Sequence, residues 1–155
     1  IDAAAAVGIP AGYISGEFSC KGALGAVIVE NLLVPKGQTC SLDRTRVLGS
    51  SKVLEGATLT AKYINVDGRL QADKSKSITM YAATIRGNVQ VVENGSVSLD
   101  RSYIDGDVQL FKNTSSVKVS NNMVGGNLQC KENRKLPTGG GNIVHGKKED
   151  QCSRL

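Results

Sequence analysis

The sequence GRLQADKSKSITMYAATIR (residues 68–86) is followed by GNVQVVENGSVSLDRSYID (87–105) and GDVQLFKNTSSVKVSNNMVG (106–125), and these segments align residue by residue. The same period extends in both directions, so that six units start at Glu30, Gly49, Gly68, Gly87, Gly106 and Gly126. Successive starts are 19 residues apart, except for a last offset of 20. A fixed period of this length is typical of a solenoid, in which each repeat is one coil and stacked coils share a core.

Within each unit, apolar residues recur at fixed positions with polar residues between them. In the unit that starts at Gly87 they are Val89 and Val91, then Val97 and Leu99, and finally Ile104. Alternation with a period of two predicts short strands with one buried face. The eighth position is Gly, Ser or Asn, and we expect a tight corner there because Gly and Asn tolerate positive φ. The sequence therefore predicts an all-β fold, a parallel β-solenoid of about six coils of 19 residues, right-handed as parallel crossovers favour.

The seventh position of the units alternates strictly in charge: Lys36, Glu55, Lys74, Glu93, Lys112, Glu132. In a solenoid these side chains lie one rung, about 4.8 Å, apart. Each exposed pair is worth only ~0.2–1 kcal/mol, but the alternation disfavours a slip of one coil. The column indicates the register of the repeat and no binding site.

A chain of 155 residues forms one domain by size and can bury a core without help. We expect an N-terminal cap and an irregular first coil over residues 1–29, the repeats over 30–133 and a C-terminal cap over 134–155. Caps are needed because the ends of a solenoid expose unpaired strand edges. The Ala-rich residues 1–13 suit a short helix over the first coil, or the segment that follows a removed signal peptide.

Four cysteines lie near the two ends of the predicted stack: Cys20, Cys40, Cys130 and Cys152. Two of their three pairings would join opposite ends, which the short reach of a disulfide excludes. The remaining pairing joins Cys20 to Cys40 and Cys130 to Cys152, and each loop of about 20 residues is worth roughly 3 kcal/mol. A zinc site is the rival interpretation, but there is no CxxC pair and a single His, so we expect neither metal nor cofactor. Disulfides indicate an exported protein, either secreted or at the cell surface.

Charge and hydropathy exclude several classes of partner. The net charge of +5 is spread over the chain and lacks a basic stripe with interleaved aromatics, so we do not expect nucleic-acid binding. A weak affinity for acidic polymers of the cell envelope stays open. No apolar run is long enough to predict a membrane span.

Residues with catalytic potential are far apart in the predicted stack. Asp43 and Asp100 share a column but lie three coils, roughly 14 Å, apart, which is too far for a carboxylate pair. Asp67, Arg86 and Asp105 share another column, which we interpret as a surface row of ion pairs. His145 lies in the tail without a neighbouring carboxylate in the sequence pattern. We therefore expect no enzymatic activity.

Two outward columns are unusual in composition. One is a ladder of amides on the first strand, which we interpret as structural because stacked amides hydrogen-bond along the axis, in preference to ligand binding: Gln71, Gln90, Gln109, Gln129. The other comprises two files of hydroxyls on the middle strand, about 6.6 Å apart along the strand and 4.8 Å between rungs: Thr39, Ser41, Thr58, Thr60, Ser77, Thr79, Ser96, Ser98, Ser116.

The hydroxyl files are similar to the Thr-x-Thr arrays of ice-binding solenoids, and they also suit hydrogen bonding to a repeating polysaccharide. They can also be ordinary exposed strand positions, for which Thr has a high propensity. Lys118 interrupts one file, and Asp43, Lys62 and Asp100 flank it with strongly hydrated charges. We therefore rank a surface or carbohydrate-contacting module first and ice binding second.

The segments NLLVPKGQTCSLDRTRVLG (31–49), GNVQVVENGSV (87–97) and GGNLQCKEN…GGGN…KKEDQC (125–152) resemble an uncharacterised family of small secreted bacterial proteins. The resemblance extends from about Phe18 to the end and implies export and a β-helix without any activity. The short coil also resembles that of bactofilins, which polymerise end to end. The cysteines and expected caps depart from that pattern, so a polymerising scaffold is the third hypothesis, and the oligomeric state stays open.

Overall fold

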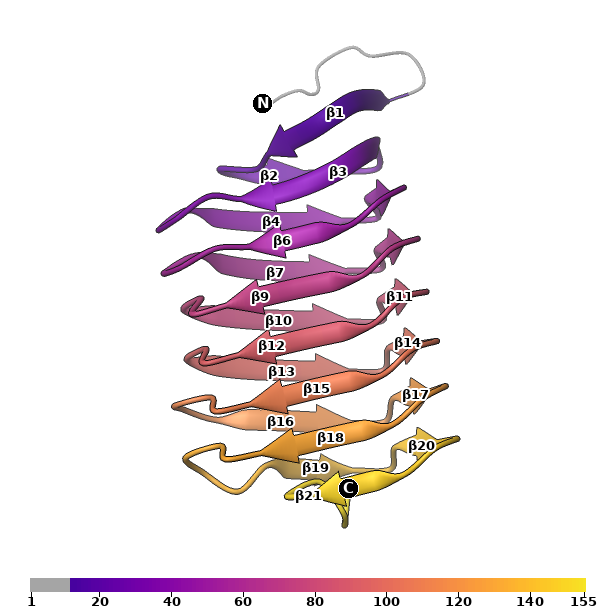
Figure 1. Ribbon diagram of the computed structural model, residues 1–155. Coiled ribbons are helices and arrows are strands. Elements are labelled where there is room, and N and C mark those ends of the chain that lie inside the picture. Colours follow the sequence, from indigo (N-terminus) through magenta and orange to yellow (C-terminus); the bar gives the residue numbers. More distant parts are fainter. Residues whose placement is uncertain (1–11) are drawn as a thin grey trace.

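The computed structural model describes residues 12–155, and within them the chain is a parallel β-solenoid of about seven turns with about 19 residues per turn and no helix. The predicted fold class is confirmed. In Figure 1 the near strands run to the left and the far strands to the right as the chain descends, which is a right-handed winding. The expected Ala-rich cap at residues 1–13 lies almost entirely outside the described residues.

Each coil contributes one strand to each of three faces. The near side in Figure 1, here called the glutamine face, stacks β3 (Ile28–Val34), β6 (Ser51–Val53), β9 (Leu70–Asp73), β12 (Val89–Val92), β15 (Val108–Phe111), β18 (Leu128–Lys131) and β21 (Lys148–Asp150). The far side, the hydroxyl face, stacks β2 (Ala23–Leu24), β4 (Thr39–Asp43), β7 (Thr58–Lys62), β10 (Ser77–Tyr81), β13 (Ser96–Asp100), β16 (Val117–Ser120) and β19 (Thr138–Gly140).

The third face is made of two-residue strands and is called the short face. It stacks β5 (Arg46–Val47), β8 (Asn65–Val66), β11 (Thr84–Ile85), β14 (Tyr103–Ile104), β17 (Met123–Val124) and β20 (Ile143–Val144). The long strand β3 pairs with both β5 and β6, so the short and glutamine faces form one continuous sheet. β1 (Tyr13–Ser19) pairs with β3 with a register shift, as expected of an irregular first coil.

The core is a narrow column of aliphatic side chains along the axis. Val89 pairs with Leu70 on one side and Val108 on the other, and all three are buried, as the repeat alignment predicts. The fully buried side chains of residues 12–155 include no aromatic ring, because three strands of one coil leave no room for one. Ser51 is an exception in this apolar column, with a buried hydroxyl that has no hydrogen-bond partner.

The first corner differs from the prediction that Asn and Gly provide positive φ at the eighth position. In the first two coils Gly37 and Gly56 do have φ of 71° and 72°. In the later coils the left-handed residue is the charged one before it, and the eighth position carries a buried polar side chain: Ser75, Asn94, Asn113 and Asn133. The prediction is therefore wrong for these four coils, three of which have an asparagine that contributes hydrogen bonds through its side chain.

These asparagines form a hydrogen-bonded ladder inside the solenoid. The Asn113 Oδ1 atom accepts the backbone N–H of Asn94 at 2.9 Å, and the Asn133 Oδ1 atom accepts that of Asn113 at 3.0 Å. The Asn133 Nδ2 atom donates to the carbonyl of Leu110 at 2.8 Å. Because the corner interrupts the sheet, these bonds satisfy backbone groups that would otherwise be buried without partners.

The second corner has a shorter ladder of the same kind. The N–H of Ser102 donates to Asn122 Oδ1 at 2.8 Å, and the N–H of Asn122 donates to Asn142 Oδ1 at 2.9 Å. The Asn142 Nδ2 atom then donates to the carbonyl oxygen of Leu155 at 2.9 Å. Both ladders run toward the C-terminal end of the solenoid.

The third corner explains why five of the six units begin with glycine. A Cβ atom on Gly87 would lie 2.7 Å from the carbonyl oxygen of Gly68, the corresponding residue of the coil above. The Gly87 N–H donates to that oxygen at 2.9 Å. Stacked corners therefore approach too closely for any side chain here, and the glycine column is a steric requirement of the coil spacing.

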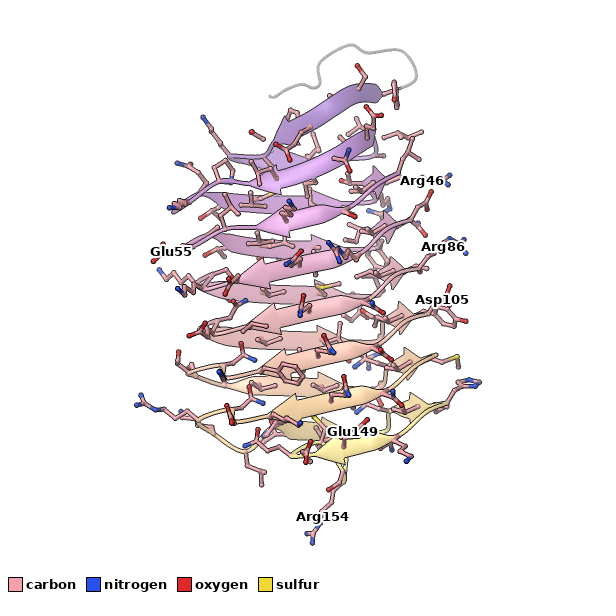
Figure 2. The ribbon with its side chains drawn as sticks, in the orientation of Figure 1. Arg46, Glu55, Arg86, Asp105, Glu149 and Arg154 are labelled. Carbon is pink, nitrogen blue, oxygen red and sulfur yellow. A yellow bond between two sulfur atoms is a disulfide. The ribbon has the colours of Figure 1, made fainter. Side chains whose placement is uncertain are left out.

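The alternating charge column lies along the first corner, where Figure 2 shows Glu55 at the edge of the solenoid. Within residues 12–155, one of its neighbouring pairs is at ion-pair distance, Lys112 Nζ and Glu132 Oε1 at 3.9 Å. Both side chains are exposed, so the pair contributes little to stability, as expected for a column that specifies register.

The C-terminal segment continues the ladders past the predicted boundary at residue 133. The strands β19, β20 and β21 pair with β16, β17 and β18 and complete another coil. The expected cap is confined to the turn after β21, where Gln151 bonds Asn133 and Leu155 bonds Asn142. These contacts end both asparagine ladders.

The disulfides pair as the sequence predicts. The Sγ atoms of Cys20 and Cys40 are 2.10 Å apart, and their Cα atoms are 5.5 Å apart. The second disulfide joins Cys130 to Cys152, with the Cα atoms 5.3 Å apart. All four cysteines are buried, so each disulfide fixes one end of the solenoid to its first or last regular coil.

The asparagine ladder predicts effects of different size for two neighbouring glycine substitutions. Asn113→Gly leaves the Asn94 N–H buried without a partner and should lower the free energy of unfolding by about 1–3 kcal/mol. Lys112→Gly should change it by less than about 1 kcal/mol, since Lys112 has φ of 57° and glycine relieves that conformation. Urea unfolding followed by circular dichroism measures both. If Asn113→Gly is as stable as Lys112→Gly, the ladder does not stabilise the corner.

The disulfides predict local effects at the two ends. Peptide mapping without reduction should find Cys20 linked to Cys40 and Cys130 linked to Cys152. Replacing Cys130 and Cys152 by Ser should speed amide hydrogen exchange in β19 to β21 and leave β9 to β13 protected, because each coil contacts only its neighbours. The matched Cys20→Ser/Cys40→Ser variant should loosen the other end. Free thiols, or a uniform loss of protection, would contradict this assignment.

Candidate functional site

The hydroxyl face places the predicted Ser and Thr residues in two files. In the first file Thr39, Thr58, Ser77 and Ser96 pair in register from β4 to β13. In the second file Ser41, Thr60, Thr79 and Ser98 pair in the same way, and Lys118 follows Ser98 on β16. Ser116 lies just before β16, where its carbonyl oxygen accepts the Val97 N–H at 2.9 Å. The structure thus brings the nine predicted hydroxyl residues onto one face.

The hydroxyls of the central coils are half-buried by one another. Thr58, Thr60, Thr79 and Ser98 have intermediate exposure. The Ser96 hydroxyl donates to the Ser77 hydroxyl at 3.2 Å, a hydrogen bond between neighbouring members of the first file. The other hydroxyls have no side-chain partner within residues 12–155, so they present donors and acceptors outward.

The glutamine ladder is hydrogen-bonded in its lower half. The Gln109 Nε2 atom donates to Gln129 Oε1 at 2.9 Å, and Gln129 Nε2 donates to Glu149 Oε2 at 3.3 Å. The ladder therefore extends to Glu149, a residue that the sequence pattern did not include. These bonds support the structural interpretation of the column.

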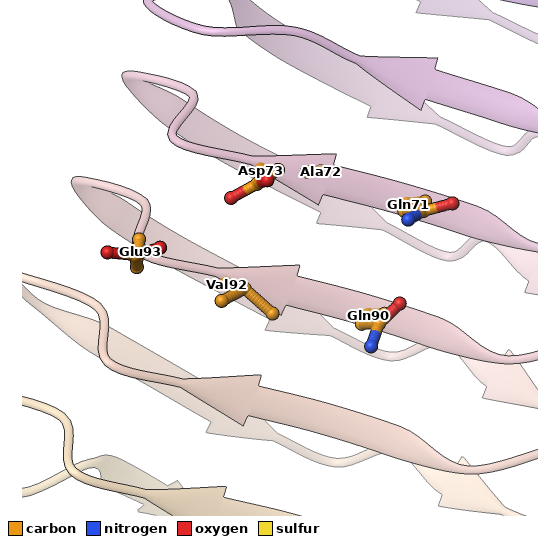
Figure 3. Close-up of a pocket in the computed structure, with 6 residues that line it drawn as sticks. All are labelled: Gln71, Ala72, Asp73, Gln90, Val92 and Glu93. Carbon is orange, nitrogen blue, oxygen red and sulfur yellow. The ribbon is translucent and has the colours of Figure 1, made fainter.

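The upper half of the glutamine face is slightly hollowed. Figure 3 shows Gln71 and Gln90 one above the other on β9 and β12, with Asp73 on the same side of the first strand. A shallow pocket of about 170 Å³ lies here, and a second of about 220 Å³ lies above it beside Lys52 and Leu54. Both are small, open depressions between side chains, below the usual size of a small-molecule site.

A cluster of four residues that the sequence pattern did not reveal borders the hydroxyl face. It lies where the strands β4, β7, β10 and β13 end. The Arg44 guanidinium lies over the Tyr63 ring at 5.0 Å from its centroid, and Arg101 lies over the Tyr81 ring at 5.7 Å. The two rings meet edge to face, with centroids 5.8 Å apart. We call these four residues the tyrosine–arginine corner. Each arginine also binds its preceding aspartate, Asp43 at 2.7 Å and Asp100 at 2.9 Å.

The cluster was missed because Tyr81 lies outside the column that Arg44, Tyr63 and Arg101 share. Tyr81 ends β10, whereas Tyr63 follows the end of β7 and has left-handed φ of 55°. The contact is therefore diagonal, between the last strand position of one coil and the corner position of the coil before it. In the strand register Tyr81 is paired with Lys62 and Asp100 and not with Tyr63.

The predicted ion-pair row lies beside the short face, where Figure 2 labels Arg46, Arg86 and Asp105 along one edge. The Asp67 carboxylate lies 3.1 Å from Arg46 Nη2 and 3.8 Å from Arg86 Nε. The expected row of ion pairs is therefore present but centred on Asp67, which pairs with Arg86 and Arg46. Asp105 is not part of it within the described residues. Asp105 instead neighbours Tyr103, and hydrogen-bonding interaction with the Asp105 carboxylate, followed by its negative charge, raises the pKa of Tyr103.

Comparison with family models, curated proteins and solved structures found no match to this chain. Residues 12–155 contain no helix that could cross a membrane. Within the same residues, no three His, Cys, Asp or Glu side chains lie close enough together to hold a metal ion. The candidate site is thus the hydroxyl face with its tyrosine–arginine corner.

Proposed function

We propose that this protein is an exported, non-catalytic module that contacts carbohydrate through its hydroxyl face. The observation that carries the proposal is the register of the two hydroxyl files over four neighbouring strands of this face, β4, β7, β10 and β13. A rigid surface with regularly spaced hydroxyls can hydrogen-bond to a polymer whose own hydroxyls repeat. Rigidity helps because little side-chain freedom is lost on binding when the side chains are already half-buried.

Export is supported by the two buried disulfides, since disulfides form and persist in oxidising compartments. The proposal contains no catalytic step because the aspartates nearest the hydroxyl files belong to separate ion pairs. Asp43 binds Arg44 and Asp100 binds Arg101, on β4 and β13, three rungs apart.

Ice binding is the second candidate. The observation that favours it is the in-register pairing of Thr39 with Thr58 in one file and of Ser41 with Thr60 in the other. Charge and aromatic bulk at the border of the face weigh against it. Lys118 continues one file directly, and Lys62 and Tyr81 lie on the adjacent column. End-to-end polymerisation has less support, since the turn after β21 bonds Asn133 and Asn142 of the last coils.

The substitution Thr60→Tyr tests the proposal by placing a bulky ring at the centre of the hydroxyl face. We expect the wild-type protein to bind one or more polysaccharides in a glycan array and in sedimentation with insoluble polymers. Thr60→Tyr should weaken that binding by about tenfold, the loss expected when a few hydrogen bonds are prevented. Thermal hysteresis and ice recrystallisation of both proteins measure the alternative activity.

The matched control is Gln90→Tyr, which adds the same ring at a half-buried outward position of the glutamine face. It should bind like the wild type. Equal losses in both variants would mean that the hydroxyl face is not the contact. Thermal hysteresis that Thr60→Tyr abolishes, without any glycan binding, would replace the carbohydrate proposal by ice binding.

A further inference from the structure

We propose that the tyrosine–arginine corner selects acidic polysaccharides, by binding the carboxylates of uronic acid residues in a chain that lies along the hydroxyl face. This inference rests on the proposed carbohydrate function and specifies the class of carbohydrate. Its starting point is the position of the corner. Tyr81 lies one outward strand position beyond the second hydroxyl file, about 6.6 Å away by the spacing of a strand. The other three residues each follow the last residue of their strand.

The four side chains form one continuous stack parallel to the solenoid axis. The order is Arg44, Tyr63, Tyr81 and Arg101, from four successive coils, with neighbouring groups 5.0 to 5.8 Å apart. The outer two residues are three rungs, roughly 14 Å, apart along the axis. A guanidinium therefore lies at each end of an aromatic pair, over a length that suits a short stretch of polysaccharide.

Both guanidiniums retain donors for a ligand. Each uses one Nη1 atom to bind its own aspartate, and no other acceptor within residues 12–155 lies at hydrogen-bond distance. An arginine has five N–H donors in a planar fork that matches a carboxylate. The side chains of Arg44 and Arg101 are 64% and 58% exposed, so these donors face solvent.

The charge around the corner favours an anion. Arg44, Lys62 and Arg101 outnumber the two aspartates, which leaves one net positive charge. Lys62 lies in register between Asp43 and Tyr81, and no carboxylate of the described residues is within ion-pair distance of its ammonium group. Lys118 adds another positive charge on the hydroxyl face, and the whole chain carries +5.

The tyrosines provide the apolar part of a sugar site. Tyr63 is 45% exposed and Tyr81 is half-buried, so ring surface remains accessible beside the hydroxyls. Stacking of the carbon-bound hydrogens of a sugar on such rings, with arginine donors beside them, combines affinity for the ring with selection for its acidic group. A neutral polymer would use the rings and hydroxyls but leave the arginines without a charged partner.

The experiment compares oligogalacturonate with the same oligosaccharide after its carboxylates are reduced to alcohols, each titrated calorimetrically at low and high salt. The wild type should bind the acidic oligosaccharide at least about tenfold more tightly at low salt, and less so at high salt. Arg44→Gln/Arg101→Gln should remove this preference and leave binding of the reduced oligosaccharide within about twofold of wild type. Circular dichroism melting establishes that the variants fold. Lys62→Gln is a milder second variant, which should reduce the preference for the acidic oligosaccharide without abolishing it.

The control is Arg46→Gln/Arg86→Gln, which removes the same charge from the edge of the short face around Asp67. It should keep the preference for the acidic oligosaccharide. An equal loss in both double variants would mean that only net charge attracts the ligand and would overturn the inference. Equal binding of the two oligosaccharides by wild type, lost in Thr60→Tyr, would overturn it while leaving the proposed function intact. If the wild type bound neither oligosaccharide nor any other glycan, both the inference and the proposed function would be overturned.

Discussion

The structure depends on the hydrogen bonds that join each coil to the coils above and below it. These bonds fix one rung spacing for all three faces, so a side chain at a given position of one unit always lies next to its counterpart in the next unit. No coil closes a core alone, and the apolar interior exists only because rungs are stacked. The glycine column at the start of the units follows from the same spacing, since the Gly68 carbonyl leaves no room for a side chain at position 87.

Corners are the weak points of such a stack, because the chain turns there and the sheet hydrogen bonds are interrupted. This protein compensates with buried asparagines that accept a backbone N–H from the coil above and donate to a carbonyl. Unpaired backbone groups in a buried corner would each cost about 1–3 kcal/mol. The ladders grow toward the C-terminal end, where Gln151 and Leu155 complete them, and a disulfide fixes that turn to the last regular coil.

The regular stacking also determines which functions are accessible to the molecule. Outward columns repeat one chemistry along the axis, which suits a ligand that is itself a repeating polymer. The interior is filled with aliphatic side chains and the two surface pockets are small. A cluster that departs from the repeat therefore indicates where a more specific contact can form. The tyrosine–arginine corner beside the hydroxyl files is such a cluster.

The sequence by itself determined everything that follows from a period of 19 residues: the fold class, the buried columns, the hydroxyl and glutamine files and the pairing of the cysteines. It also located the glycines, but not the reason for them. Tertiary structure alone decided three features, because each depends on partners in other coils. From the sequence, Asn113 is expected to provide a positive φ. Its hydrogen bonds to the neighbouring coils show that it acts through its side chain instead. The last coil, β19 to β21, has little of the apolar pattern beyond Ile143 and Val144, and it forms because the coil above offers its free edge. Tyr63 and Tyr81 meet diagonally across two coils, a contact that the corner geometry creates and that no alignment of columns contains.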